Sequence, residues 1–306
     1  MEYYLGIDIG SSSIKVALVE VGTGMSIGLV QEPKDEMNML ALQNGWAEQD
    51  PEEWWTMVCK AIKKVKKATN VSRTQIKGVG ISYQMHGLVL VDENGHLLRK
   101  SIIWCDSRAV EIGKTAYEEL GTDKCDGELL NSPANFTASK LKWVQENEPD
   151  IYDKIKKFML PGDYIAYRLT GKMNTTISGL SEGVFWNFKN NVPASFLLEY
   201  LGISEDLIPD ITDTFGFQGE VNAQGEKESQ IAMGTPILYR AGDQPNNALS
   251  LNVFNPGEIA ATGGTSGVVY AITDNLSVKE SSRVNNFAHV NYEVGKEPRI
   301  GKLLCI

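Results

Sequence analysis

Short hydrophobic runs, interrupted by glycine- and serine-rich turns, mark both ends of the chain. Residues 3–21 are mainly hydrophobic on either side of the turn 10–13, which predicts a β-hairpin. Residues 258–272 repeat the pattern around the turn 263–267. Repetition of one supersecondary unit indicates two related lobes.

A helical period begins at Pro51 and continues to Ala68, with Asp50 placed to cap the helix. Its hydrophobic positions are Trp54, Val58, Ala61, Ile62 and Val65. Lysines fill the other positions and predict a solvated face. Further strands are predicted at 76–82 and 236–241, a hairpin at 88–104, and helices at 109–120, 139–146, 162–169 and 192–201.

Composition is that of an ordinary globular protein with room for two domains. The chain has 306 residues, of which 42% are hydrophobic and 22% charged. A net charge of −10 argues against a nucleic-acid partner, because lysine and arginine supply most of the affinity for a phosphate backbone. Four widely separated cysteines predict reduced thiols and a cytoplasmic protein. No signal peptide or membrane span is expected.

Two turns have the character of phosphate-binding loops. Gly10, Ser11, Ser12 and Ser13 offer backbone amides and hydroxyls, with Lys15 close behind. Gly264, Thr265 and Ser266 form a similar turn in the second hairpin. A single turn of this kind is also what a plain hairpin needs, so the pairing of the two is what favours a polyphosphate held between lobes.

Two aspartates stand where hydrophobic strands end. Asp8 precedes the first turn and is either a Mg²⁺ ligand or a cap of the turn, because a buried carboxylate is costly without a cation or a partner. Asp243 follows the strand 236–241 and either accepts a proton from an attacking hydroxyl or begins a turn before a helix.

Polar side chains interrupt two other predicted strands. Gln84, Met85 and His86 offer the neutral donors and acceptors that suit a polyol, although a lone histidine is more often structural. Asp106 and Arg108 either bind sugar hydroxyls or pair with each other.

These segments resemble the FGGY family of carbohydrate kinases, in order along nearly the whole chain. The similar segments are residues 6–15, 45–54, 82–87, 104–108, 137–147, 163–171, 241–244 and 261–269. The segment 82–87 is similar to the sugar-contacting segment of xylulokinases.

The resemblance implies an α/β, ribonuclease H-like (actin-like ATPase) lobe with a mixed sheet flanked by helices over residues 1–245. It implies the start of a similar lobe over 246–306. It also implies Mg-ATP as phosphate donor, with Asp8 and Asp243 at the metal and Asp243 as base. The turn residues given above would hold the phosphates, and Gln84, Met85, His86, Asp106, Arg108 and Asp243 would bind sugar.

The expected activity is therefore transfer of the γ-phosphoryl group of ATP to a pentulose such as xylulose. Residues 174–176 and 245–247 depart from the family pattern, which leaves ribulose, gluconate and glycerol as alternative substrates. The chain is also shorter than its relatives. We therefore expect a truncated second lobe and a dimer, and a sugar-binding fragment without activity is the alternative.

Overall fold

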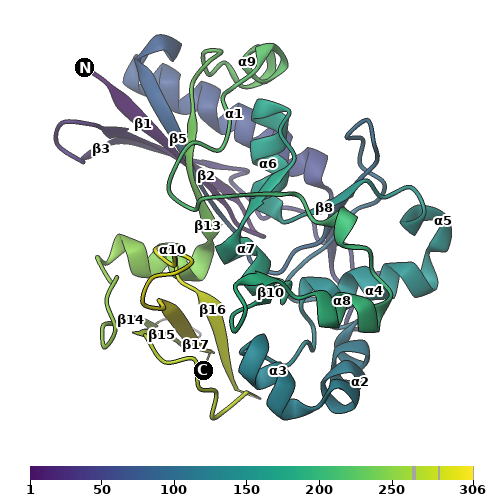
Figure 1. Ribbon diagram of the computed structural model, residues 1–306. Helices are drawn as coiled ribbons and strands as arrows, with labels where there is room; N and C mark the ends of the chain where they lie inside the picture. The colour runs from purple at the N-terminus through teal and green to yellow at the C-terminus, as the bar shows by residue number, and fades with distance from the viewer. Residues whose placement is uncertain (264–266, 282, 306) are drawn as a thin grey trace.

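The computed structural model of the chain describes residues 1–263, 267–281 and 283–305 (Figure 1). Its larger sheet has five strands in the order β13-β5-β1-β2-β3. Their bounds are β1 Tyr3–Ile9, β2 Ile14–Glu20, β3 Ser26–Glu32, β5 Ile76–Tyr83 and β13 Ile237–Gly242. β1, β2 and β3 form an antiparallel meander, while β5 and β13 run parallel to β1. This mixed order is the one expected for a ribonuclease H-like lobe.

Helices cover one face of this sheet. Alternate residues of β1 (Tyr3, Leu5, Ile7 and Ile9) share a buried hydrophobic cluster with α1 Pro51–Thr69 and α6 Pro161–Thr170. The helix α1 begins where the sequence predicts, because the Asp50 carboxylate accepts a hydrogen bond from the Glu52 amide. The helix α9 Ala223–Ser229 packs beside α1 and α6. The opposite face of β1 is more open, with Tyr4 exposed and Asp8 partly buried.

Helices and short strands extend the first lobe beyond the sheet (Figure 1). The helices are α2 Val110–Leu120, α3 Thr122–Glu128, α4 Thr137–Asn147, α5 Pro149–Tyr152, α7 Ile177–Glu182 and α8 Ser195–Leu201. Two 3₁₀ turns span Arg73–Gln75 and Glu205–Leu207. The short strands are β4 Glu48–Gln49, β6 Val89–Val91, β7 Ser101–Ile102, β8 Lys157–Met159, β9 Asn174–Thr176, β10 Trp186–Asn187, β11 Val192–Pro193 and β12 Asp210–Thr212.

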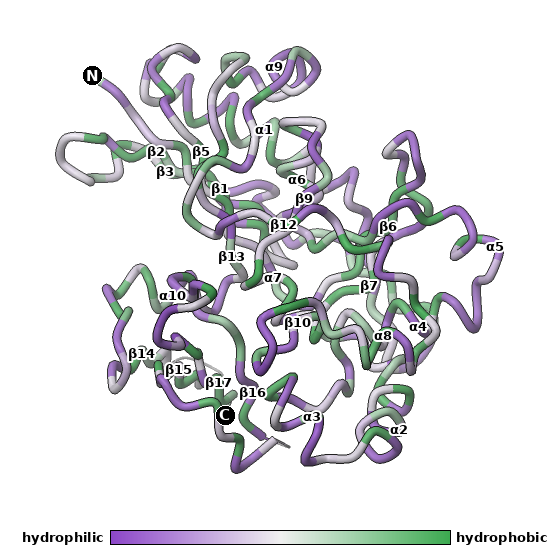
Figure 2. The backbone as a smooth tube through the Cα atoms, in the orientation of Figure 1, coloured by the Kyte–Doolittle hydropathy of each residue, from purple (hydrophilic) through white to green (hydrophobic). Residues whose placement is uncertain are grey.

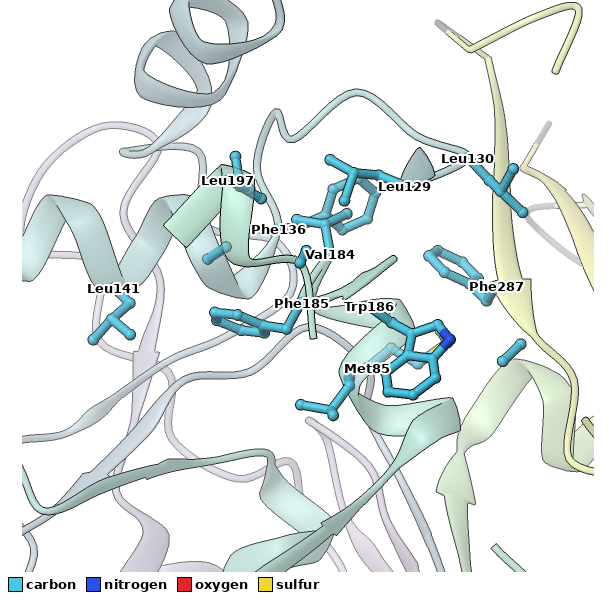
Figure 3. Close-up of a cluster of buried hydrophobic side chains, with 14 of the residues drawn as sticks. Met85, Leu129, Leu130, Phe136, Leu141, Val184, Phe185, Trp186, Leu197 and Phe287 are labelled. Atoms are coloured by element: carbon cyan, nitrogen blue, oxygen red, sulfur yellow. The ribbon is translucent and has the colours of Figure 1, made fainter. Parts of the chain in front are cut away.

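A second sheet of antiparallel strands follows α10 Asp243–Ser250, in the order β14-β15-β17-β16. Its strands are β14 Ile259–Gly263, β15 Gly267–Thr273, β16 Val284–Ala288 and β17 Ile300–Cys305. Figure 3 shows Phe287 of β16 in the same buried cluster as Met85 and Phe136. Figure 2 shows hydrophilic stretches at α5 and α10 and hydrophobic ones in the interior strands. The second sheet is thus anchored to the first lobe by a shared core.

The predicted elements agree with the structure except at one hairpin. Both terminal hairpins, α1, and the predicted strands around β5 and β13 are confirmed. The predicted hairpin over residues 88–104 is confirmed in part: its halves form antiparallel bridges at Val91–Leu97 and Leu88–Ile102, and the Leu98 amide donates to the Leu90 carbonyl at 3.0 Å. Its named strands, however, make their ladders elsewhere, because β6 pairs with β8 and β7 pairs with β4. Segments that are distant in the sequence pair with the edges of these strands.

Two features are absent from the residues that the structure describes. None of their helices combines the length and hydrophobicity that a membrane crossing requires. The four cysteines form no disulfide.

An ion pair beneath the end of β13 gives a first prediction. Arg240 is fully buried and its Nε lies 2.8 Å from Asp163 Oδ1 on α6. We expect Asp163→Ala to lower the free energy of unfolding by about 3–5 kcal/mol, because it leaves a buried guanidinium without its counter-charge. Urea unfolding followed by circular dichroism measures the loss. The double variant Asp163→Leu with Arg240→Met should recover stability, because it removes both charges. A loss of less than about 1 kcal/mol in the free energy of unfolding of Asp163→Ala would contradict this expectation.

Candidate active site

Three parallel strands end at the same edge of the larger sheet. Asp8 of β1 lies opposite Ser82 of β5, and Ser82 lies opposite Ala241 of β13. Neighbouring strands are about 4.8 Å apart, so the backbones at Asp8 and Ala241 are separated by roughly 10 Å. Asp243 follows two residues after Ala241. The sheet therefore brings to one edge the two aspartates that the sequence singles out.

Asp243 is the first residue of α10 and lines a cavity. Burial raises the pKa of its carboxyl to about 7, and the negative charge of Asp8 adds to the rise. Hydrogen bonds from backbone amides, including that of Gln244, act in the opposite direction but are outweighed. A carboxylate with this pKa can accept a proton near neutral pH.

Asp8 lies on the open face of β1 with its side chain 38% exposed. Its Oδ2 is 3.4 Å from Lys15 Nζ, directly across the hairpin on β2. The charge of Asp8 contributes to the raised pKa of Asp243. Asp243 lines a cavity whose described walls do not include Asp8, and a cleft shared by the two carboxylates stays a prediction.

The first turn is compact and held from several sides. The Gly10 amide donates to the Ser13 carbonyl at 3.1 Å, and a Cβ at Gly10 would stand 3.0 Å from that oxygen. The Ser11 carbonyl accepts from Gln49 Nε2 at 2.6 Å, and the Ser12 carbonyl accepts from the Met37 amide at 2.9 Å. Ser12 is exposed. The turn is therefore preorganised, with Ser12 facing solvent.

The second predicted turn lies outside the described residues. Gly264, Thr265 and Ser266 are the residues concerned. The strands that flank them, β14 and β15, do form the expected hairpin, with Gly263 opposite Gly267.

A cavity of about 770 Å³ opens beside Asp243. Its walls from the first lobe include Met85, His86, Trp104 and Phe136. The second sheet adds side chains from β15 and β17, among them Val268 and Leu303. Met85, His86 and Asp243 are thus the predicted sugar-binding residues that the structure brings together at one cavity. Its size and mixed walls suit a small polyol.

Gln84 is buried beside the cavity rather than in its wall. Its Nε2 donates to Gln49 Oε1 at 3.1 Å, and its amide donates to the Ile9 carbonyl at 2.7 Å. Trp54 Nε1 donates to the same Gln49 oxygen at 3.2 Å. These bonds tie the end of β5 to β1 and α1, and they make Gln84 a structural support in this arrangement.

Asp106 and Arg108 form a buried ion pair instead of facing the cavity. Arg108 Nη2 is 2.7 Å from Asp106 Oδ2, which also accepts from the Ala47 amide at 2.6 Å. The guanidinium lies 3.9 Å from the ring centre of Trp46. Both side chains are almost completely buried. The sequence left open whether Asp106 and Arg108 bind sugar or pair with each other. The geometry shows that they pair, because the carboxylate and the guanidinium already have partners within the protein.

Two charged residues near the cavity were missed by sequence reasoning. Lys140 of α4 is fully buried and donates to the carbonyls of His86 and Ile103 at 2.8 and 3.0 Å. Glu182 of α7 is 1% exposed and its Oε1 accepts from the His86 amide at 3.3 Å. The helical spacing of Lys140 with Leu141 and Val144 was the available signal, since it places the lysine on the buried face.

The described residues include no cluster of three or more histidine, cysteine, aspartate or glutamate side chains able to hold a metal ion. The pair of Asp8 and Asp243 nevertheless fits a hard divalent cation, because Mg²⁺ usually takes one or two carboxylates together with substrate phosphates. Burial first and the charge of Asp8 second raise the pKa of Asp243, and a cation bound beside its carboxylate would oppose both effects.

A stability prediction follows from that pKa. The pKa of Asp243 is about 7 in the folded protein and near 3.8 when unfolded, so the folded state binds the proton more tightly between these values. The free energy of unfolding should therefore fall as pH rises from 3.8 to about 7. Asp243→Asn should remove this part of the fall and be more stable than wild type at pH 8. Urea titrations of both proteins across this range measure it, and parallel curves would contradict the assignment.

Comparison with known proteins identifies the family. A model of the N-terminal domain of the FGGY family of carbohydrate kinases matches residues 3–250. A xylulose kinase from Staphylococcus epidermidis is 33% identical over 292 residues, which cover 94% of this chain and 56% of the relative. One from Escherichia coli is 29% identical over 287 residues, covering 94% and 57%.

Longer proteins of solved structure contain the same fold. A xylulose kinase from Rhodospirillum rubrum has a TM-score of 0.88 at 21% identity, over 99% of this chain and 60% of that one. A glycerol kinase from Plasmodium falciparum with ADP has a TM-score of 0.88 at 19% identity, over 100% and 61%. The predicted actin-like ATPase fold is confirmed. This chain spans little more than half the length of the relatives it matches, and it belongs to the FGGY family of carbohydrate kinases.

Proposed function

We propose that the protein transfers the γ-phosphoryl group of ATP to a hydroxyl of a pentulose such as xylulose. The observation that carries the proposal is a carboxyl with a pKa of about 7, Asp243, in the wall of a cavity of about 770 Å³ and at the same edge of the sheet as Asp8. The relatives named xylulose kinase support the choice of sugar. We place the reaction in the cytoplasm, and dimerisation stays a prediction that a sizing column tests.

Asp243 would act as the general base. Its carboxylate takes the proton of the attacking hydroxyl as the oxygen moves in line with the transferred phosphorus. Met85 and His86, which line the same cavity, would orient the sugar and so supply the positioning on which phosphoryl transfer mainly depends. Gln244, which also lines the cavity, would contact the same ligand.

The turn of Gly10 to Ser13 would hold phosphate oxygens with its amides and hydroxyls, with Lys15 beside it. Gly264, Thr265 and Ser266 are proposed for the same task from the second lobe. Asp8, through water, and Asp243 would hold Mg²⁺, which neutralises charge on the phosphates when bound. We propose residues 1–245 as the sugar- and phosphate-binding lobe and 246–306 as part of the nucleotide-binding lobe.

Coupled detection of ADP release tests the function directly. Xylulose, ribulose, gluconate and glycerol should each be offered to the full-length protein with Mg-ATP. We expect the highest kcat/KM with xylulose. A different preferred sugar would change the substrate assignment alone, whereas sugar binding without ADP release would overturn the kinase assignment.

Replacing the base gives a sharper prediction. Asp243→Ala should lower kcat by about 10²–10⁴-fold, the usual contribution of a general base, while calorimetry still detects sugar binding. Asp274→Ala is the matched control, because Asp274 is an exposed aspartate beyond β15. A kcat for Asp243→Ala within about threefold of wild type would exclude the base role.

The proposed role of Asp8 in binding Mg²⁺ gives another testable prediction. Asp8→Asn keeps the size of the side chain and removes its charge, so the Mg²⁺ concentration for half-maximal rate should rise by about 10–100-fold. Steady-state rates over a Mg²⁺ series measure this. The effect should be specific to the metal, so an unchanged Mg²⁺ dependence with a raised KM for the sugar would place Asp8 outside the metal site.

A further inference from the structure

His86 occupies an unusual backbone conformation at the cavity wall. Its φ is 60°, in the left-handed region that few residues other than glycine adopt, although histidine, asparagine and aspartate adopt it more often than the rest. Gly87 follows, and a Cβ there would lie 2.6 Å from Cγ of Pro161. The chain is therefore forced through a narrow path, and contacts must hold His86 in a conformation that costs energy.

Glu182 holds His86 from one side through two atoms. Its Oε1 accepts from the His86 amide at 3.3 Å, and its backbone carbonyl lies 2.9 Å from His86 Nδ1. The other carboxyl oxygen, Oε2, is buried without a hydrogen-bond partner among the described residues. It would lie 2.5 Å from a Cβ on Gly242, so Glu182 packs directly beneath the residue that precedes Asp243.

Lys140 holds His86 from the other side. Its Nζ donates to the His86 carbonyl at 2.8 Å and to the Ile103 carbonyl at 3.0 Å. Glu182 of α7 thus binds the amide of His86, and Lys140 of α4 binds its carbonyl. Both of these side chains are buried. Neither side chain lines the cavity, and both contact the backbone of His86, which does.

The ring of His86 is fixed as well. A carbonyl oxygen only accepts, so the contact with Glu182 requires the proton on Nδ1. Burial, helped by the charge of Lys140, lowers the pKa of His86 to about 3, so the ring is neutral at pH 7 and Nε2 carries a lone pair. Phe136 and Phe287 flank the ring with centroids 4.9 and 5.4 Å away (Figure 3 shows both side chains). Nε2 has no hydrogen-bond partner among the described residues.

We propose that Glu182 and Lys140 are positioning residues that hold His86 in one backbone conformation and one ring tautomer, with Nε2 as the acceptor for a ligand hydroxyl at the cavity wall. The identity of that ligand as a sugar rests on the proposed function. The ligand must then carry a hydroxyl that donates to His86 Nε2. An analogue that lacks this hydroxyl leaves Nε2 without a partner and should bind more weakly.

The tautomer is tested without turnover. Nitrogen-15 spectra of the histidine ring at pH 7 should show His86 protonated at Nδ1 and unprotonated at Nε2. His86→Gln assigns the signal by its disappearance. A ring protonated at Nε2, or at both nitrogens, would overturn the proposal whether or not the protein is a kinase.

Glu182→Ala and Glu182→Gln separate positioning from stability. Burial raises the pKa of Glu182 well above its ordinary value, which favours the uncharged acid, so glutamine reproduces both its shape and its acceptor oxygen. We expect Glu182→Ala to raise the sugar KM by about tenfold with kcat within about threefold, and Glu182→Gln to restore the wild-type KM. Lys140→Met should resemble Glu182→Ala.

Glu32→Ala is the matched control, because Glu32 is equally buried but pairs with Lys60 and Lys64 on α1, away from the cavity. It should lower the melting temperature and leave the sugar KM unchanged. Equal KM values for wild type and Glu182→Ala, or equal losses in the alanine and glutamine variants, would overturn the positioning role. If wild type turns over no sugar, the proposed function fails while the ring spectrum still decides the tautomer.

Discussion

Repulsion between two carboxylates at the end of one sheet is the interaction on which the candidate site depends. β1, β5 and β13 run in the same direction, so Asp8 and Asp243 emerge at one edge. Burial of Asp243 and the charge of Asp8 together raise the pKa of Asp243 to about 7. A site of this kind is unfavourable for folding on its own, and it becomes favourable when a cation or a proton is present.

Buried polar groups contact one another close to the same edge. Arg240, three residues before Asp243, is fully buried against Asp163 of α6. Gln84 connects the end of β5 to β1 and, through Gln49, to α1. These contacts join the ends of β5 and β1 and hold the edge strand β13 against α6. Rigid strand ends matter because positioning, rather than covalent chemistry by the protein, dominates phosphoryl transfer.

Local patterns in the sequence were sufficient for the two terminal hairpins and for α1 with its Asp50 cap, and they singled out Asp8 and Asp243. They were insufficient wherever the partner is distant in the chain. Asp106 and Arg108 look like a sugar-binding pair, but Glu48 and the rings of Trp46 and Trp143 complete a buried cluster around the arginine. Lys140 was read as part of a family segment, although its function depends on two carbonyls more than 35 residues away.

Two acids flank Gly242, and their surroundings give them different capacities. Asp243 lines the cavity, so a hydroxyl can reach it and its proton can later leave. Glu182 is 1% exposed and contacts the His86 amide, so no ligand can exchange a proton with it. Burial raises the pKa of both carboxyls, but only the one with access to the cavity can act as a base. The other is suited to hold the histidine that faces the ligand, because an uncharged, inaccessible acid gives a fixed hydrogen bond that solvent cannot replace.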